Sequence, residues 1–205
     1  MAGSLTMVRG TDAIIVCLKS SSLLTCISMA TYLRAWIYQL EFEPINNPLD
    51  ETKILGAVTD EGDFVLHPDV SQFELEDVEL EFREMVEDRK REAMSVLNRR
   101  GSKAYDKHVL NGRTVILTGD ILFDTLSLAI IEDIMKPIRP QQIIGVAGNV
   151  TIDVSDRFHM KTTATNILDI LPHSLFDDEH YFEKPDEYSD DEKRALATNI
   201  CNYWI

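Results

Sequence analysis

Short apolar runs alternate with amphipathic segments along most of the chain. Residues 12–18 are almost wholly apolar, as in a strand buried on both faces, and residues 23–33 follow with the apolar content of a mostly buried helix. Residues 36–42 are typical of a second strand, so the chain is predicted to open with a β-α-β unit. Its first loop, residues 19–22, lies where doubly wound folds place anion sites.

The middle of the chain predicts a hairpin and one long helix. Residues 54–60 and 63–68 are strand-like and are separated by a Glu-Gly turn, which is typical of a β-hairpin. Residues 72–100 carry apolar side chains at spacings of three and four, with acids early and basic residues late, as the helix dipole favours.

The second half returns to alternating strands and helices. We expect, in order, a strand at 114–118, a helix at 123–135, a strand at 142–147, a short helix at 154–161 and a strand at 166–171. An acidic segment, 175–193, then leads into a final helix that a capping box opens at Ser189. Such alternation predicts an α/β fold, in which a parallel sheet of about five strands is flanked by helices. We expect a single domain over 1–205, with the hairpin at 53–68 and the helix at 72–100 as insertions.

Charge and cysteine content narrow the classes of partner. The formal net charge is -15 over 205 residues, and an acidic surface repels nucleic acids and anionic membranes. Three cysteines without a paired motif favour a reducing compartment, and no signal-peptide pattern opens the chain. We therefore expect a cytoplasmic protein that binds neither nucleic acid nor membrane. The histidines show no zinc-type spacing, so no metal ligands are predicted among them.

Four segments resemble one enzyme family. They are the strand, loop and helix at 12–33; the turn at 44–48 with the hairpin sequence at 55–62; the stretch Leu110 to Leu117; and the C-terminal motifs at 180–183 and 189–192. Together they make the chain similar, over nearly all its length, to bacterial phosphoribosyltransferases of the Rossmann-like type I fold. Members of this family are glycosyltransferases of nucleotide metabolism. They displace pyrophosphate from phosphoribosyl pyrophosphate (PRPP) with a nitrogen nucleophile, usually with Mg²⁺.

The resemblance also locates a donor site that departs from the family pattern. The family motif has two acids that bind ribose, followed by a glycine-containing turn that binds the 5'-phosphate through backbone N–H groups. The matching positions here are Gly119 and Asp120 for the acids, Ile121 for the first glycine, Asp124 for a threonine, Thr125 for a glycine and Ser127 for the last threonine. The family's pyrophosphate loop corresponds to Lys19, Ser20 and Ser21, and its basic loop to Arg99, Arg100 and Lys103.

Two functional interpretations follow from these substitutions. In the first, PRPP chemistry is lost or strongly reduced and the protein is a binding or regulatory module, because a carboxylate at Asp124 would repel a phosphate. In the second, an active phosphoribosyltransferase uses Asp120 for ribose or metal-bound water and Ser127 and loop N–H groups for the phosphate of PRPP or another phosphorylated molecule. Lys19 would then bind pyrophosphate, with Mg²⁺ as cofactor.

Structural roles compete with these assignments. Asp124 suits the N-cap or first turn of the helix that follows it, and the serines at 20–22 suit the cap of the helix at 23–33. A third interpretation is a structural role in a homodimer, for which the helix at 72–100 is the candidate interface.

Overall fold

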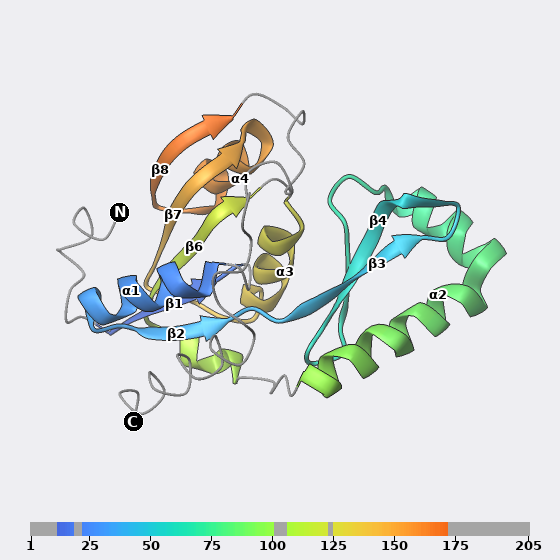
Figure 1. Cartoon of the computed structure of the whole chain (residues 1–205), viewed down its shortest axis with the longest axis horizontal. Helices are drawn as coiled ribbons and strands as arrows, with labels where there is room; N and C mark the ends of the chain where they lie inside the picture. Colours follow the sequence, from blue (N-terminus) through green and yellow to red (C-terminus); the bar gives the residue numbers. More distant parts are fainter. Residues whose placement is uncertain (1–11, 19–21, 101–105, 123–124, 172–205) are drawn as a thin grey trace. The chain divides into compact units, whose positions relative to one another are not determined.

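The computed structural model describes residues 12–18, 22–100, 106–122 and 125–171 (Figure 1). The chain forms two compact units, which we call the sheet unit and the hairpin unit. The sheet unit comprises Met1–Gln39, Val109–Asp124 and Arg139–Ile205, and the hairpin unit comprises Leu40–His108 and Thr125–Ile138. The expectation that residues 1–205 act as one domain stays a prediction.

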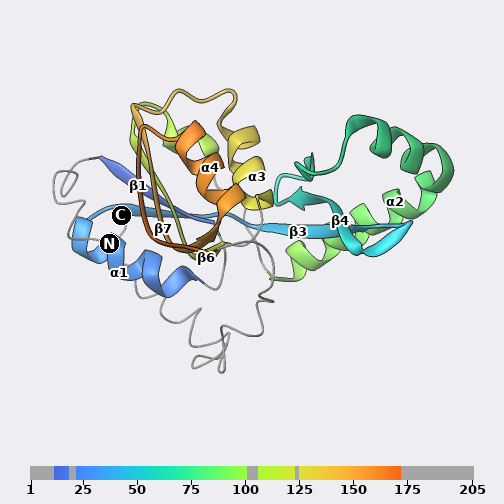
Figure 2. The same cartoon turned by 90° about the horizontal axis from the view of Figure 1, so that it is seen from above.

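A five-stranded parallel sheet forms the sheet unit. Its strands lie in the order β2 (Trp36–Gln39), β1 (Ala13–Cys17), β6 (Thr114–Leu122), β7 (Gln142–Thr151) and β8 (Ala164–Leu171). Helices α1 (Leu23–Leu33) and α4 (Ile152–Lys161) lie on opposite faces of this sheet (Figure 2). Parallel neighbouring strands need such crossover connections. Each crossover is right-handed, and the α1 and α4 connections run toward opposite edges of the sheet, so their helices lie on opposite faces.

The core of the sheet unit follows from its apolar runs. All five residues of β1 are buried, and Ile15, Ile116 and Val146 from three adjacent strands pack with Leu33 and Met29 of α1. These side chains are nearly inaccessible to water, so the hydrophobic effect holds the central strands together. The predicted α/β class, with a five-stranded parallel sheet flanked by helices, is confirmed.

The hairpin unit contains a second, antiparallel sheet. Strands β3 (Phe42–Asn47), β4 (Asp50–Thr59) and β5 (Phe64–Leu66) form it in that order, and helices α2 (Gln72–Arg100) and α3 (Leu126–Met135) pack against it. A short 3₁₀ helix, η3, spans Lys107–Leu110. The predicted hairpin and long helix are therefore confirmed.

A kink at Phe82 divides α2 into two halves. The backbone there has φ -124° and ψ 25°, outside the helical range. Val78 and Val86, on either side of the kink, pack on Leu55, while Ala93 and Leu97 pack on Val58 and Ile45. Residues on both sides of the kink therefore share the cluster on Leu55, while the second half alone buries the cluster on Val58 and Ile45.

Several predicted element boundaries are wrong. The segment 36–42 is not one strand: β2 ends at Gln39 and Phe42 begins β3, which pairs with β4 in the other sheet. The sequence 42–47 contains Pro44 and alternates weakly, so it does not predict an edge strand. Strands β6 and β7 each run four residues beyond their predicted ends. The acidic segment and final helix predicted after 175 lie outside the described residues.

Candidate functional site

The candidate site lies where the strand order of the parallel sheet reverses. From β1 the chain passes to β2 on one side, while β6 pairs with β1 on the other side. The segments that follow β1 and β6 therefore diverge at the carboxyl edge of the sheet. In open α/β folds this switch point is the usual place for a ligand.

Asp120 of β6 is fixed at this edge by two hydroxyl groups from the start of α1. Its backbone N–H donates a hydrogen bond of 2.8 Å to Oγ of Ser22, which is wholly buried. Its carboxylate accepts a hydrogen bond from the Thr25 side chain. Burial raises the pKa of the Asp120 carboxyl above its ordinary value, and the Thr25 hydrogen bond only partly offsets this.

The start of α1 therefore already has an anion beside it. Thr25 lies in the first turn of α1, so its bond to Asp120 brings a carboxylate to the positive end of the helix dipole. In doubly wound folds this helix end is where a ligand phosphate binds. A phosphate there would have to approach the Asp120 carboxylate.

Ser22 has a different role from the predicted cap. It is the N-cap residue of α1, but its side chain makes no capping hydrogen bond. Its oxygen accepts the N–H of Asp120 instead, which ties two segments 98 positions apart in the sequence. The capping prediction is wrong for this serine, because the strand end competes successfully for its hydroxyl oxygen.

Strand β6 continues through Ile121 and Leu122, the first two positions at which the resemblance expects a phosphate-binding turn. Ile121 pairs with Asn149 and Leu122 with Val150 of β7, so the ladder extends two residues beyond Asp120. The Asp120 carbonyl oxygen approaches Gly148 so closely that a Cβ atom on this glycine would lie 2.3 Å from it. Gly148 therefore allows the two strands to stay together at this point.

An apolar side chain fills the space at the first acid position of the motif. A Cβ atom on Gly119 would lie 2.8 Å from Cδ2 of Leu122, which is itself buried. An aspartate at position 119 would therefore displace Leu122. Glycine at position 119, in place of the family's first acid, therefore leaves room for the apolar side chain of Leu122.

Two buried thiols lie beneath Asp120. Cys17 ends β1 and Cys26 lies on α1, and both side chains are fully buried. The hydrogen bond with Cys17 and burial raise the pKa of the Cys26 thiol strongly, with a smaller effect from the Asp120 charge. A thiol held protonated in this way is a poor nucleophile.

The structure describes only some of the other predicted site residues. Lys19, Ser20, Ser21 and Asp124 lie outside the described residues, as does Lys103. Thr125 and Ser127 belong to the hairpin unit, where both are buried at the start of α3. The N-cap residue of α3 is Thr125, so the helix predicted from Phe123 begins at Leu126.

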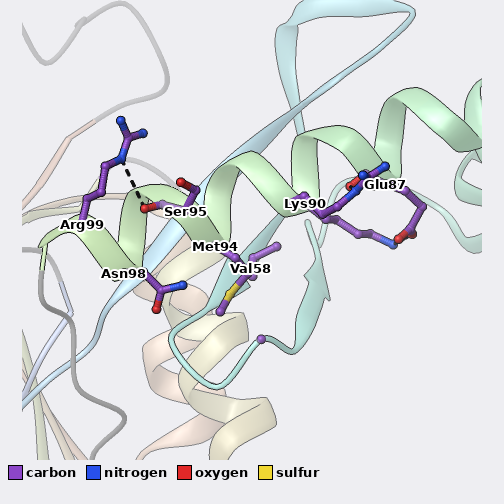
Figure 3. A pocket seen from close by; sticks show the side chains of 9 residues that line it. Val58, Glu87, Lys90, Met94, Ser95, Asn98 and Arg99 are labelled. Atoms are coloured by element: carbon purple, nitrogen blue, oxygen red, sulfur yellow. Dashed lines mark hydrogen bonds and ion pairs between the residues drawn. The ribbon is translucent and has the colours of Figure 1, made fainter.

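The hairpin unit carries a groove of its own along the second half of α2 (Figure 3). The cavity measures about 570 Å³ and is lined by Val58 and Gly62 of the β4–β5 hairpin and by Glu87, Lys90, Arg91, Met94, Ser95, Asn98 and Arg99 of α2. No sequence pattern predicts this groove, because one wall is a helix face that is polar in sequence and the other is a hairpin earlier in the chain.

Several lysine and arginine side chains near the groove already contact other groups of the chain. Lys90 is 2.9 Å from the Glu87 carboxylate and 4.7 Å from the ring centre of Phe64. The Nε of Arg99 donates to the Ser95 carbonyl at 3.3 Å (Figure 3). Arg100, assigned by resemblance to a basic loop, pairs instead with Glu43 of β3 at 2.7 Å.

Two features are absent from the described part of the chain. Within it, no helix is both long and apolar enough to cross a membrane. The same residues contain no group of three or more histidine, cysteine, aspartate or glutamate side chains placed to hold a metal ion.

The fold is shared with a solved structure. The protein TT1426 of Thermus thermophilus superposes with a TM-score of 0.66 at 16% sequence identity, covering 97% of this chain and 92% of its own. No family model matches the chain, and no curated protein does either. At this identity the likeness concerns the fold alone.

Known phosphoribosyltransferases are more distant structural neighbours. A hypoxanthine phosphoribosyltransferase of Staphylococcus aureus has a TM-score of 0.44 at 12% identity, covering 84% of this chain and 70% of its own. A purine phosphoribosyltransferase of Pyrococcus horikoshii has a TM-score of 0.41 at 11% identity, covering 86% and 88%. Scores below 0.5 are too low to support an assignment, so no functional conclusion rests on them.

Proposed function

We propose that this chain is a phosphoribosyltransferase-like protein whose PRPP-dependent transfer is lost or strongly reduced, and which acts as a binding or regulatory module. One observation carries the proposal. Strand β6 runs on through Ile121 and Leu122, paired with β7, where the resemblance expects a phosphate-binding turn.

A phosphate-binding turn needs backbone that a strand does not offer. Successive N–H groups must converge on the anion, usually with glycine at positive φ. In Ile121 and Leu122 the backbone is part of the β6–β7 ladder, and β-branched Ile121 disfavours positive φ. Turn formation here would require breaking the end of that ladder, which costs free energy before any ligand binds.

Electrostatics point the same way. The Asp120 carboxyl, hydrogen-bonded by Thr25, is held at the first turn of α1. When it is ionised, it repels a phosphate or pyrophosphate brought to the same helix end, by about 1 kcal/mol or more at contact distance even in water. The resemblance adds a second carboxylate, Asp124, to the expected phosphate position.

The experiment is a pyrophosphate-release assay with PRPP, Mg²⁺ and a panel of nucleobases. The wild-type chain and an Asp120→Ala variant are compared with Asp156→Ala, which removes an exposed acid of α4 as a matched control. We expect all three to release pyrophosphate at the rate of the uncatalysed mixture. Release by the wild type and the control but not by Asp120→Ala would refute the proposal.

That refuting result would establish the second interpretation, an active enzyme with an unusual donor site. The observation in its favour is Asp120 itself, a half-buried carboxyl retained at the switch point of the sheet. In such an enzyme Asp120 would hold ribose hydroxyls or metal-bound water, and Mg²⁺ would offset the charge of the pyrophosphate. The nucleobase that gave release would then identify the acceptor.

A further inference from the structure

Two large apolar side chains stand exposed on the first half of α2. The exposed fraction is 79% for Phe73 and 88% for Leu80, and the two lie seven positions apart, on one face of the helix. Single exposed apolar residues are ordinary, but two on one helix face make a stripe that water solvates poorly.

The charges of α2 change sign at its kink. From Gln72 to Phe82 the helix has five acidic residues and no basic one, whereas from Arg83 to Arg100 it has six basic and four acidic residues. The helix therefore has an acidic half with the exposed apolar stripe and a basic half with the groove described above. Figures 1 and 2 show α2 along the outside of the three-stranded sheet.

The stripe and the groove belong to one continuous face. A second hollow, of about 320 Å³, is lined by Glu76, Leu80, Arg83, Val86 and Glu87. Glu87 also lines the larger groove, so the two hollows are neighbours along α2. The lining of the larger groove includes the apolar side chains of Val58 and Met94 (Figure 3) and the exposed side chains of Arg91 and Arg99.

We propose that this α2 face is the interface of a homodimer, in which the acidic half of α2 in each copy lies over the basic half in the other. The charges favour a second copy as the occupant, because an acidic stripe and a basic groove on one helix complement each other when two copies are related by a two-fold axis. Leu80 of each copy then enters the groove of the other copy.

The antiparallel order sets the pairing. With Leu80 of one copy entering beside Met94 of the other, positions run in opposite directions along the two helices. Glu84 then comes opposite Lys90 and beside Arg91, and Asp77 comes within one helical turn of Arg99. Each contact occurs twice, so a substitution at one position perturbs both ends of the interface.

Sedimentation velocity of the full chain over a micromolar concentration series tests the interface. We expect a reversible dimer that rising salt weakens. Replacing both Phe73 and Leu80 by Asp should raise the dissociation constant about tenfold or more. Met160→Asp, which changes an equally exposed apolar residue in the sheet unit, should leave it unchanged. The proposal would be overturned if the wild type stayed monomeric over the whole concentration series, or if the Phe73 and Leu80 substitutions left the dissociation constant of the dimer unchanged.

A charge exchange distinguishes this pairing from any other dimer. Asp77→Arg alone and Arg99→Glu alone should each weaken the dimer, since each brings like charges close to one another twice. An equimolar mixture of the two variants should regain wild-type affinity, because every facing pair in the mixed dimer is again of opposite charge. Both positions are exposed, so folding is unaffected, and circular dichroism checks this. A mixture no tighter than its components would contradict the proposed pairing.

Discussion

Replacing Gly148 by alanine tests whether β6 really continues as a strand past Asp120. A Cβ atom at position 148 would lie 2.3 Å from the Asp120 carbonyl oxygen and 3.2 Å from its carbonyl carbon. Both obstacles are backbone atoms, so no side-chain rotation relieves them. Ordinary contact begins at about 3.5 Å, so the two strands must separate by about 1 Å at this point.

The expected cost follows from that separation. Overpacking of a tight site costs about 1–3 kcal/mol, and weakening one or two ladder hydrogen bonds adds about 1 kcal/mol each. We therefore expect Gly148→Ala to lower the free energy of unfolding by about 2–4 kcal/mol. Gly112→Ala is the comparison: this glycine has φ +71° and no atom within 4 Å of the added Cβ, so only backbone strain of about 1 kcal/mol is expected.

Urea denaturation followed by circular dichroism measures both variants against the wild type. Because the chain has two compact units, the transition that reports the sheet unit must be identified first, for which Trp36 fluorescence in a Trp204→Phe background serves. A Gly148→Ala protein within about 0.5 kcal/mol of wild type would show that β6 does not run beside Gly148. The structural argument against a phosphate-binding turn would then fail.

Three further predictions concern single side chains of the sheet unit. Asp120→Asn should increase stability at neutral pH, because the raised pKa of Asp120 makes its ionisation costlier in the folded state than in the unfolded state. The wild type therefore loses stability as the pH rises from 3.8, the ordinary pKa of aspartate, through the higher pKa of the folded state. Unfolding midpoints of both proteins from pH 3 to 8 check this. A stability gain of Asp120→Asn over the wild type that did not become smaller in acid would contradict it. In a Cys201→Ser background, Cys17 and Cys26 should react with a thiol reagent only at the rate of unfolding; rapid reaction of the native protein would show that they are accessible. Arg113→Met should change stability by less than about 1 kcal/mol, because two effects oppose each other. The variant loses the stacking of the guanidinium, 4.8 Å from the Trp36 ring centre, but also removes a buried Nη1 that has no hydrogen-bond partner among the described residues. Thermal melts that showed a larger loss would refute this.

The sequence predicts elements well where a local pattern determines them. The buried strand β1 and helix α1 lie within one residue of their predicted bounds, because apolar runs act over short distances. The hairpin around Gly62 was also predicted, although its first strand begins four residues before the predicted start. The long helix α2 also has its predicted bounds. Its kink at Phe82 was not foreseen, because no proline or glycine marks it in the sequence.

The end of β6 shows how a resemblance can outweigh a local signal. Ile121 and Leu122 are residues that strands favour, yet the family motif led us to expect a turn at these positions. The apolar run that predicted the strand stops at residue 118, so neither the pattern nor the resemblance predicted the extension. The glycine that permits the extension, Gly148, is on another strand, and nothing near Asp120 in the sequence points to it.

The contacts of the candidate site were beyond sequence reasoning for a different reason. Asp120 was selected as the surviving acid, but its partners Ser22 and Thr25 lie more than 90 positions away. Only the parallel pairing of β1 with β6 brings these segments to one edge. Serine and threonine near a helix start also predict capping, so the sequence alone favoured the wrong role for Ser22.

The most direct test of the central claim is isothermal titration of the purified chain with PRPP, with and without Mg²⁺. The account predicts no binding tighter than about millimolar, with the same trace from an Asp120→Ala variant. Micromolar binding that depends on Mg²⁺ and disappears in Asp120→Ala would contradict it. PRPP would then bind despite the Asp120 carboxylate at the start of α1 and the extension of β6 through Leu122.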